Sequence, residues 1–322
     1  MIEPETTDDA MTPRVENPQP ADRRCGFIAI LGAPNAGKST LINALVGSKV
    51  AIVSQKVQTT RVPVRGIAIE GKSQLVFIDT PGIFRPKRRL DRAMVEAAWA
   101  GAGDADAVLF LIDAARGLDE DAMRILEKLG TAPGRQRIAV LNKVDRVDNK
   151  ENLLGLAAEL VKAGSFERVF MISALSASGV LDVKQYLATV VPPGPWHYDE
   201  DDVTDAPMRL FAAEITREKI YKYLHDELPY ATTVETTSWQ DRKDGSTRIE
   251  QTIFVERDGQ RSIVLGKGGQ AIKQISTEAR RDMALSFERP IHLFLFVKVR
   301  ENWGSDPERY REMGLEYPKD ET

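Results

Sequence analysis

The segment LGAPNAGKST, residues 31–40, constrains the fold more than any other stretch of this chain. It contains the pattern G-x-x-x-x-G-K-S from Gly32 to Ser39, with an apolar run before it and an apolar-periodic segment after it. The glycines of such a loop let successive N–H groups point at phosphate oxygens, and a following helix adds its positive dipole end. The pattern therefore predicts a phosphate-binding loop that joins a strand to a helix.

The polar side chains of this loop have separate expected tasks. Lys38 carries a point charge to the β- and γ-phosphates, and the hydroxyl of Ser39 is available to Mg²⁺. A loop of this kind does not distinguish ATP from GTP, so the base must be recognised elsewhere. The residues expected to contact the nucleotide here are Gly32, Ala33, Pro34, Asn35, Ala36, Gly37, Lys38, Ser39 and Thr40.

Short apolar runs alternate with amphipathic segments over the first two thirds of the chain. The runs that read as buried strands are 26–32, 74–80, 107–113, 137–142 and 168–174, and the helical segments include 91–102, 119–130 and 150–164. This alternation favours the α/β class, with a mostly parallel, doubly wound sheet covered on both faces. In such sheets ligands bind beyond the carboxyl ends of the strands, where the remaining polar motifs of this region lie.

Two strand ends predict that the base is guanine. A carboxylate at Asp145, in the tetrapeptide NKVD, can accept from both guanine N1–H and the 2-amino group, whereas adenine would leave it unpaired. Asn142 would brace the neighbouring loops, and the Lys143 stem would lie over the base. At the next strand end the N–H of Ala174 is expected to reach guanine O6, with Ser173 holding the loop. The base-binding set is Asn142, Lys143, Val144, Asp145, Ser173, Ala174 and Leu175.

The segment Asp79-Thr80-Pro81-Gly82 predicts a sensor of the γ-phosphate. Asp79 would hold the Mg²⁺ hydration shell, and the Gly82 N–H would contact the γ-phosphate. Upstream, a threonine hydroxyl of the loop SQKVQTTRV can complete the Mg²⁺ shell only while the γ-phosphate is present. Thr60 is the first choice and Thr59 the alternative, so Ser39 and Thr60 are the expected metal ligands.

The last third of the chain is built differently. An acidic, proline-rich segment at 192–207 predicts a linker, and a long amphipathic helix is expected at 207–228. Strands are expected at 231–240, 246–257 and 291–300. A G-x-x-G loop, which we expect to separate a β-rich run from a helix, lets a nucleic-acid backbone approach closely. The alternative is a plain helix-entry turn. The candidate RNA-binding residues are Gly266, Lys267, Gly268, Gly269, Lys273, Arg280 and Arg281.

In this order, the nucleotide motifs resemble those of the translation-factor-related class of small GTPases. With QTTR at 58–61, the stretches 217–235 and 253–269, and EARRDM at 278–283, the chain resembles the Era family of bacterial GTPases from about residue 25 to residue 314. The resemblance implies GTP, GDP and Mg²⁺ as ligands. It also implies an α+β type II K-homology (KH) domain, binding near the 3′ end of small-subunit (16S) ribosomal RNA, and a switch role in 30S subunit assembly.

The resemblance also bears on the expected roles of two loop residues, Ile83 and Asn35. The residue after Gly82 is Ile83, so no glutamine orients the attacking water. In potassium-activated relatives the asparagine that matches Asn35 helps hold a monovalent cation beside the phosphates. The alternative is that Asn35 only tolerates a turn conformation. The expected catalytic set is Lys38, Thr60, Asp79, Gly82 and Asn35.

The resemblance also implies a division of the chain into domains. The expected parts are a disordered tail at 1–24, a GTPase domain at 25–191, a linker at 192–207, a KH domain at 208–300, and a C-terminal helix and tail at 301–322. The aromatic residues of the second domain, which include Tyr221 and Trp303, are read as packing rather than as base-stacking platforms.

Composition limits the partners and the compartment. At a net charge of −4 the chain as a whole does not attract nucleic acid, so an RNA site must be a local patch. A single cysteine, Cys25, allows no intrachain disulfide and fits a reducing cytoplasm. With no signal peptide and no apolar run long enough to span a bilayer, we expect a cytoplasmic monomer, at most peripheral to the inner face of the cell membrane. The rival readings are a P-loop ATPase, an RNA-binding module with a decayed nucleotide site, and a GTP switch whose second domain binds protein.

Overall fold

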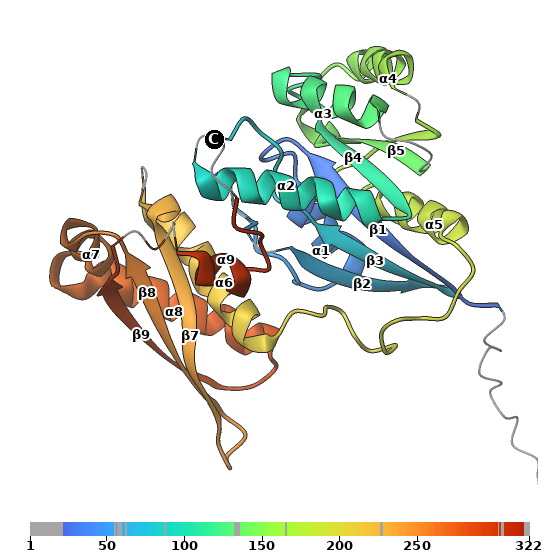
Figure 1. Cartoon of the computed structure of the whole chain (residues 1–322). Coiled ribbons are helices and arrows are strands. Elements are labelled where there is room, and N and C mark those ends of the chain that lie inside the picture. The colour runs from blue at the N-terminus through green and yellow to red at the C-terminus, as the bar shows by residue number, and fades with distance from the viewer. Residues whose placement is uncertain are drawn as a thin grey trace, which may run out of the picture.

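The computed structural model describes residues 22–318, except 55, 57–59, 62, 87, 132–135, 165, 226–227, 302 and 304–305. Most of the expected N-terminal tail and the alternative magnesium ligand Thr59 lie outside the described residues. Arg24, which we assigned to that tail, begins the first strand instead. The described residues form two bodies, each with its own sheet (Figure 1).

The first body is a six-stranded sheet with helices on both faces. Its strand order is β2-β3-β1-β4-β5-β6, and only β2 is antiparallel to its neighbour. The strands are β1 (Arg24–Gly32), β2 (Val64–Glu70), β3 (Ser73–Asp79), β4 (Ala107–Asp113), β5 (Gln136–Asn142) and β6 (Arg168–Met171). The helices are α1 (Lys38–Val46), α2 (Arg89–Asp104), α3 (Glu120–Thr131), α4 (Glu151–Ala163) and α5 (Val180–Val190). The expected mostly parallel α/β fold is confirmed.

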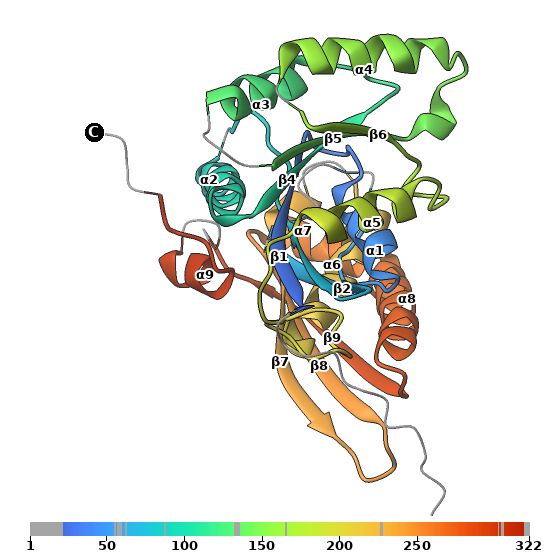
Figure 2. The same cartoon turned by 90° about the vertical axis from the view of Figure 1, so that its right-hand side faces the viewer.

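Two apolar cores hold the helices against this sheet. One lies under α1 and α5, and the other under α2, α3 and α4. Figure 2 views the sheet nearly edge-on, with α2 and α3 on one side and α1 and α5 on the other. Because successive side chains point to opposite faces, strands covered on both faces need continuous apolar runs. The run Ile28–Leu31 has no exposed side-chain surface, as such a strand requires.

The second body is a three-stranded sheet with helices on one face. The sheet order is β7-β8-β9, with β7 antiparallel and β9 parallel to β8. The elements are α6 (Met208–Tyr223), η3 (Pro229–Ala231), β7 (Thr232–Asp241), β8 (Thr247–Val255), α7 (Asp258–Leu265), η4 (Lys267–Gly269), α8 (Gln270–Ser286) and β9 (Ile291–Val299). The last helix, α9 (Pro307–Glu312), packs on α2 of the first body. Side chains of α6, α7 and α8 pack with those of the strands in two apolar clusters.

The β-rich run that we expected before the G-x-x-G loop is a helix, α7. The Gln260 side chain accepts from the N–H groups of Glu256 (2.8 Å) and Arg257 (3.2 Å), which fixes the start of this helix. Gly266 ends the helix with a φ of 72°. These end contacts outweigh the weak helix preference of the β-branched pair Ile263 and Val264.

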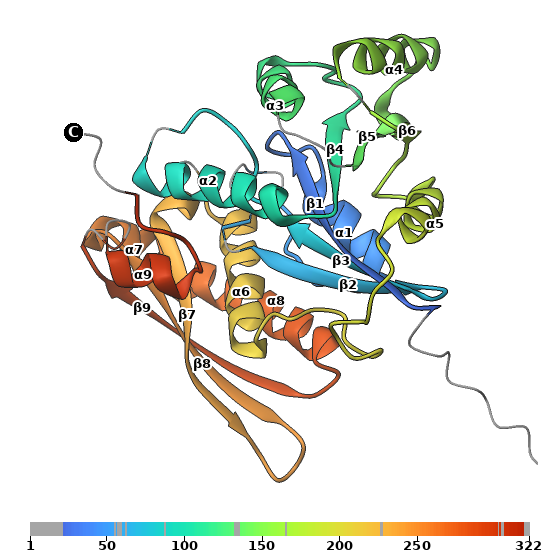
Figure 3. The ribbon, with the colours of Figure 1, turned by 45° about the vertical axis from the view of Figure 1, so that its right-hand side comes forward.

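Helix α6 is shorter than expected and is not an amphipathic surface helix. It lies between the two bodies (Figure 3) and is buried on nearly all sides from Phe211 to Tyr221. Its central charged residues, Arg217, Glu218 and Lys219, are each less than 9% exposed. A charged side chain is buried in this way only when it has partners, and both bodies supply them.

The linker lies along the edge of the first sheet. The Ile67 N–H donates to the Val203 carbonyl (2.9 Å), and the Gln74 side chain bonds the backbone of His197 and Tyr198. The linker thus pairs with β2 at Gly66 and Ile67, which satisfies part of the edge strand's backbone. No helix among the described residues is long and apolar enough to cross a membrane.

Candidate nucleotide and RNA sites

The phosphate loop runs from the end of β1 to the start of α1, as expected. Gly37 has a φ of 102°, and a Cβ there would lie 2.3 Å from the side-chain nitrogen of Asn142. Only glycine fits at this position, for both its backbone conformation and its close approach to Asn142. The Lys38 ammonium curls back over the loop and donates to the carbonyls of Gly32 (3.1 Å) and Ala33 (3.0 Å).

Lys38 is poised for a negatively charged ligand. It is 6% exposed, and burial lowers the pKa of its ammonium to about 8, against the opposing effect of Asp79. A buried cation gains from an opposite charge, because the interior screens charges less than water does. Phosphate oxygens at the loop would supply that charge.

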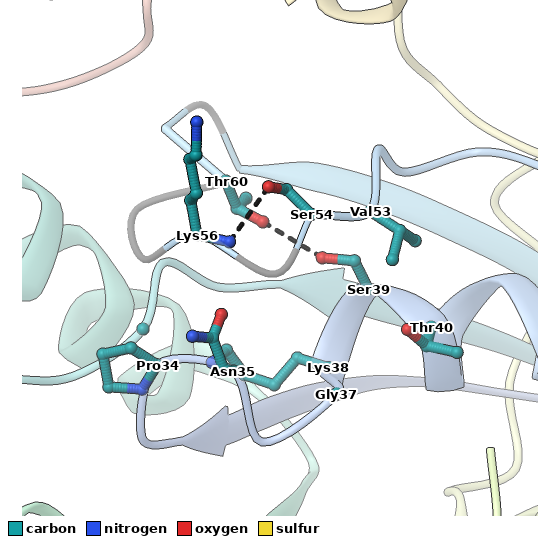
Figure 4. Close-up of a pocket in the computed structure, with 11 residues that line it drawn as sticks. Pro34, Asn35, Gly37, Lys38, Ser39, Thr40, Val53, Ser54, Lys56 and Thr60 are labelled. Carbon is teal, nitrogen blue, oxygen red and sulfur yellow. Dashed lines mark hydrogen bonds between the residues drawn. The ribbon is translucent and has the colours of Figure 1, made fainter. Parts of the chain in front are cut away.

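Three oxygen-bearing side chains converge beside the loop. The hydroxyls of Ser39 and Thr60 lie 3.2 Å apart (Figure 4). Both donate to Asp79 Oδ2, at 3.0 Å and 2.9 Å. Asp79 is 1% exposed, and burial raises its pKa to about 6, against the effects of Lys38 and the two hydroxyls. Its other oxygen, Oδ1, is buried and has no hydrogen-bond partner among the described residues. Hard oxygen donors with an unsatisfied buried carboxylate oxygen fit Mg²⁺.

The segment after Asp79 packs closely against the phosphate loop. The Thr80 hydroxyl donates to the Ile30 carbonyl (2.5 Å), and a Cβ on Gly82 would lie 3.0 Å from Pro34 Cα. The Ile83 N–H donates to the Gly32 carbonyl (3.2 Å). The structure thus brings the Asp79-Thr80-Pro81-Gly82 segment to the phosphate loop. Ile83 itself is 6% exposed and belongs to the core under α2 and α3.

Asn142 joins three loops of the site. Its side-chain N–H donates to the Ala36 carbonyl (2.8 Å), and its Oδ1 accepts from the Ala174 N–H (2.9 Å). The Ala174 N–H, which was expected to reach guanine O6, is thus bonded to Asn142, and its contact with the base stays a prediction. Asp145 is exposed in the short helix Val144–Arg146, where a base can reach it.

Lys143 lies over the phosphate loop. It has a φ of 62°, and its ammonium donates to the Asn35 carbonyl (2.6 Å) and to Asp113 Oδ2 (2.6 Å). Sequence reasoning missed Asp113, although β4 ends there and the residue is in register with Asn142. A carboxylate at the carboxyl end of a parallel strand was the available signal.

The depression over the phosphate loop contains most of the expected phosphate-side residues. Its lining combines the loop and α1 with Val53, Ser54, Lys56, Thr60 and Gly82 (Figure 4). Sequence reasoning did not select Val53, Ser54 or Lys56. Asn35 lines the depression too, and its φ of 64° shows that it adopts the turn conformation of the alternative reading. Among the described residues, no group of three or more His, Cys, Asp or Glu side chains could hold a metal ion.

The G-x-x-G loop connects α7 to α8 on the second body. A Cβ on Gly266 would lie 2.7 Å from Ala271 Cβ, so the loop turns tightly onto α8. Lys267 is exposed on the loop. Lys273, Arg280 and Arg281 are exposed along α8, and Lys273 and Arg280, seven residues apart, share one side of that helix. The expected basic residues thus lie on one loop–helix unit.

Tyr221 and Trp303 pack in the interior, as expected. Tyr221 and Trp303 are 1% and 2% exposed. The Trp303 indole N–H donates to the Ala231 carbonyl (3.0 Å). Neither ring is available to stack on a base.

Comparison with known proteins identifies the family. Residues 27–143 match a family described as 50S ribosome-binding GTPase, and residues 227–304 match the KH domain family. GTPase Era of Bradyrhizobium sp. (strain BTAi1 / ATCC BAA-1182) is 65% identical over 300 residues, which cover 93% of this chain and 97% of the relative. The chain belongs to the Era family of GTPases.

Other members of the Era family are also similar to this chain in sequence and in structure. GTPase Era of Rhizobium meliloti (strain 1021) is 62% identical, over 92% of this chain and 94% of its own length. A solved structure of a variant of Aquifex aeolicus Era bound to GDP.AlF4⁻ has a TM-score of 0.86 and 36% identity, and covers 90% of this chain and 99% of its own. A structure of Era in complex with MgGDPNP and nucleotides 1506–1542 of 16S ribosomal RNA has the same score and identity, with 91% and 99% covered.

Proposed function

We propose that this Era-family chain binds GTP and GDP with Mg²⁺ and hydrolyses GTP as a conformational switch. The convergence of Ser39, Thr60 and Asp79 beside Lys38 is the observation that carries the proposal. Each of these groups acts on a triphosphate and has no evident task without one. Thr60 stands on the loop that precedes β2, so its place can report on the γ-phosphate.

In this mechanism the chain's residues bind and orient the reactants. Lys38 and the N–H groups of 35–39 would hold the phosphates, and Ser39 and Thr60 would hold Mg²⁺, which would neutralise the charge that develops on the phosphoryl oxygens. The Gly82 N–H contacts the γ-phosphate. Water is the nucleophile and no covalent intermediate forms, so rate acceleration comes from positioning and charge stabilisation. Because Ile83 cannot orient water, we propose that potassium at Asn35 supplies further stabilisation.

The second body is proposed to bind single-stranded ribosomal RNA. The glycine loop at 266–269 lets the backbone of an unpaired strand approach, and Lys267, Lys273, Arg280 and Arg281 contact its phosphates. The solved Era complex with nucleotides 1506–1542 of 16S ribosomal RNA supports the 3′ end region as the target. The biological role that follows is assistance in assembly of the 30S subunit.

The proposed setting is the cytoplasm. We propose that the chain works as a monomer with a GTPase domain at 25–191, a linker at 192–207, a KH domain at 208–300 and a C-terminal helix and tail at 301–322. Its contact with the cell membrane, where it occurs, would be peripheral and on the cytoplasmic face.

Nucleotide competition tests the guanine assignment. We expect GTP to displace a fluorescent GDP at a concentration at least about a hundredfold below that of ATP, because adenine leaves Asp145 unpaired. Asp145→Asn should weaken guanine binding by a similar factor and favour a xanthine nucleotide, whose 2-oxygen accepts from the new amide. Asp148→Asn, an exposed residue of the same loop, is the matched control and should bind as the wild type does. Equal displacement by ATP and GTP would establish the ATPase reading instead.

RNA binding is tested by anisotropy with an oligonucleotide of the 16S 3′ end region and a scrambled one. Affinity should fall with salt, with a slope of roughly −0.7 per phosphate contact. Gly268→Asp places a negative charge in the loop and should abolish binding. Gly245→Asp is the matched control, because both glycines have positive φ (61° and 80°) and open space around them. Absence of any salt-dependent shift with the wild type would favour a protein partner for the second body.

A further inference from the structure

Arg61 ties the loop of the nucleotide site to the second body. It follows Thr60 directly in the chain, yet its side chain is 3% exposed and reaches into the pocket formed by α6, η3 and the start of β7. The guanidinium donates to the carbonyls of Thr232 (2.7 Å), Tyr230 (3.1 Å) and Pro229 (3.2 Å) and to the Tyr221 hydroxyl (3.1 Å).

This pocket is built for a guanidinium. Three of its four acceptors are backbone carbonyls, which leaves little room for adjustment. The rings of Trp303 and Tyr221 lie 5.6 Å and 6.0 Å from the guanidinium carbon. A planar fork can meet several acceptors and stack on rings at the same time, whereas an ammonium is a point donor. Lysine would keep the charge but not this geometry.

Thr60, the residue before Arg61, has its side chain in the nucleotide site. Thr60 is 8% exposed, and its hydroxyl contacts Ser39 and Asp79, the two side chains expected at Mg²⁺. Consecutive Cα atoms are about 3.8 Å apart, so the place of one residue limits the place of the next. When the second body holds the Arg61 side chain, it also limits where the Thr60 hydroxyl can lie.

The second body contacts the same loop at its other end as well. Glu218 of α6 accepts from the Val53 N–H (3.0 Å) and from the Lys49 ammonium (2.7 Å). Glu214 of α6 lines a small cavity together with Thr60 and Asp79. Helix α6 therefore contacts the first body both before the loop and at Arg61, and a shift of α6 would move Thr60.

We propose that Arg61 is a positioning residue for GTP hydrolysis, through which the second body holds Thr60 at the magnesium site. The proposal rests on the proposed function of that site. It explains why a residue beside the nucleotide has its whole side chain in the RNA-binding body. RNA that moves α6 would change hydrolysis through this side chain, without touching the nucleotide.

A double-mutant cycle tests the proposal on the full chain. Arg61→Ala should slow single-turnover GTP hydrolysis by about ten- to a hundredfold, since small misplacements of aligned groups have effects of that size. Its affinity for GDP should stay within about twofold of the wild type, because Thr60 acts only while the γ-phosphate is present. If Arg61 acts through Thr60, the double variant with Thr60→Ala is no slower than Thr60→Ala alone.

Further variants separate positioning from loss of folding. Arg65→Ala is the matched control, because Arg65 is partly exposed and paired with Asp205 (2.9 Å). It should hydrolyse GTP at the wild-type rate. Tyr221→Phe removes one acceptor of Arg61, which Arg217 also contacts, but keeps the buried ring. It should slow hydrolysis less than Arg61→Ala does and lower the melting temperature less. Arg61→Lys keeps the charge but not the geometry, so it should lower the melting temperature less than Arg61→Ala does while hydrolysis remains slow.

Three results would overturn the proposal. They are an Arg61→Ala rate within twofold of the wild type, losses that multiply in the double variant, and equal weakening of GDP and GTP binding by Arg61→Ala. A wild type that fails to prefer GTP over ATP would instead contradict the proposed function. The two failures are therefore told apart by the wild-type competition assay.

Discussion

Asn142 shows how much of the nucleotide site depends on one residue. It is 1% exposed and connects the loop at Ala36 to the loop at Ala174. Its own strand, β5, supplies neither partner. The side chain therefore keeps the phosphate loop and the base-binding loop at a constant separation, in addition to any contact with the base.

Removal of the Asn142 side chain should destabilise the nucleotide-free protein. Asn142→Ala leaves the Ala36 carbonyl and the Ala174 N–H without their buried partner, and each such loss costs about 1–3 kcal/mol. We expect a decrease of about 3 kcal/mol in the free energy of unfolding, measured by urea denaturation. Asn152→Ala on the exposed side of α4 is the control and should change stability by less than about 0.5 kcal/mol. Equal stability of the two variants would contradict the bracing role.

Substitutions of Asn35 can show whether its side chain helps hold a monovalent cation or whether the residue only adopts a turn conformation. If its side chain helps hold a monovalent cation, potassium should speed GTP hydrolysis and sodium should not. Asn35→Ala should then remove the difference between the two salts. Asn35→Gly keeps the left-handed turn that the φ of 64° requires. A glycine variant that retains potassium stimulation would leave only the turn role.

At the scale of elements, the C-terminal segment packs on the first body rather than on the sheet that precedes it. Tyr310 of α9 and Leu315 form an apolar cluster with Ala93 and Met94 of α2. Tyr310 has no exposed surface. Burial, with a smaller contribution from Tyr317, raises its pKa to about 12.

This docking predicts a loss of stability at alkaline pH. The ordinary tyrosine pKa is about 10, so the folded chain keeps a proton that the unfolded chain releases. The contribution of Tyr310 is complete below about pH 10 and is lost as the pH rises toward 12. Tyr310→Phe has no proton to lose and should flatten this part of the stability curve. Parallel curves for the wild type and the variant would exclude the assignment, and tyrosinate absorbance would show which residue titrates.

At the scale of the whole molecule, charged side chains on α6 and α8 join the two bodies. Glu218 accepts from Lys49 (2.7 Å) and Lys219 (2.8 Å), and Asp282 of α8 lies 3.3 Å from Lys49. Burial disfavours both carboxylates, but the lysines and the Val53 N–H outweigh it, so the pKa values of Glu218 and Asp282 lie below their ordinary ones. The interface therefore depends on the ionised forms.

Acid should separate the two bodies. Carboxylates with lowered pKa values stabilise the contact above their ordinary pKa, about 4, and this contribution is lost as the pH falls through the lower folded values. Glu218→Gln should weaken the contact at neutral pH by about 1–3 kcal/mol, because it removes one of the two carboxylates that pair with Lys49 and Lys219 and leaves only Asp282. Small-angle scattering would show a larger radius of gyration for the variant. Glu120→Gln, whose pair with Arg124 is solvent-exposed, should keep the wild-type radius.

The sequence alone determined the features that contiguous residues encode. A phosphate loop, the carboxylate of Asp145 and the alternation of strands and helices each depend on spacing along the chain, and the structure places them as that spacing predicts. The strand β2 was not predicted, because its apolar residues do not alternate regularly with polar ones. The turn at Gly71, whose φ is 58°, was the available signal. Such features can be predicted from the sequence because the periodicity of helices and strands and the conformations of turns depend on short segments of the chain.

Tertiary structure decided which partner each polar group takes. The Ala174 N–H bonds Asn142, Asp113 pairs with Lys143, and Arg61 enters the second body although the sequence places it beside the proposed magnesium ligand. The charged face of α6 is buried for the same reason. These contacts join residues that lie 30 to 171 positions apart in the chain. No local pattern contains them, because burial between two bodies depends on where both surfaces meet.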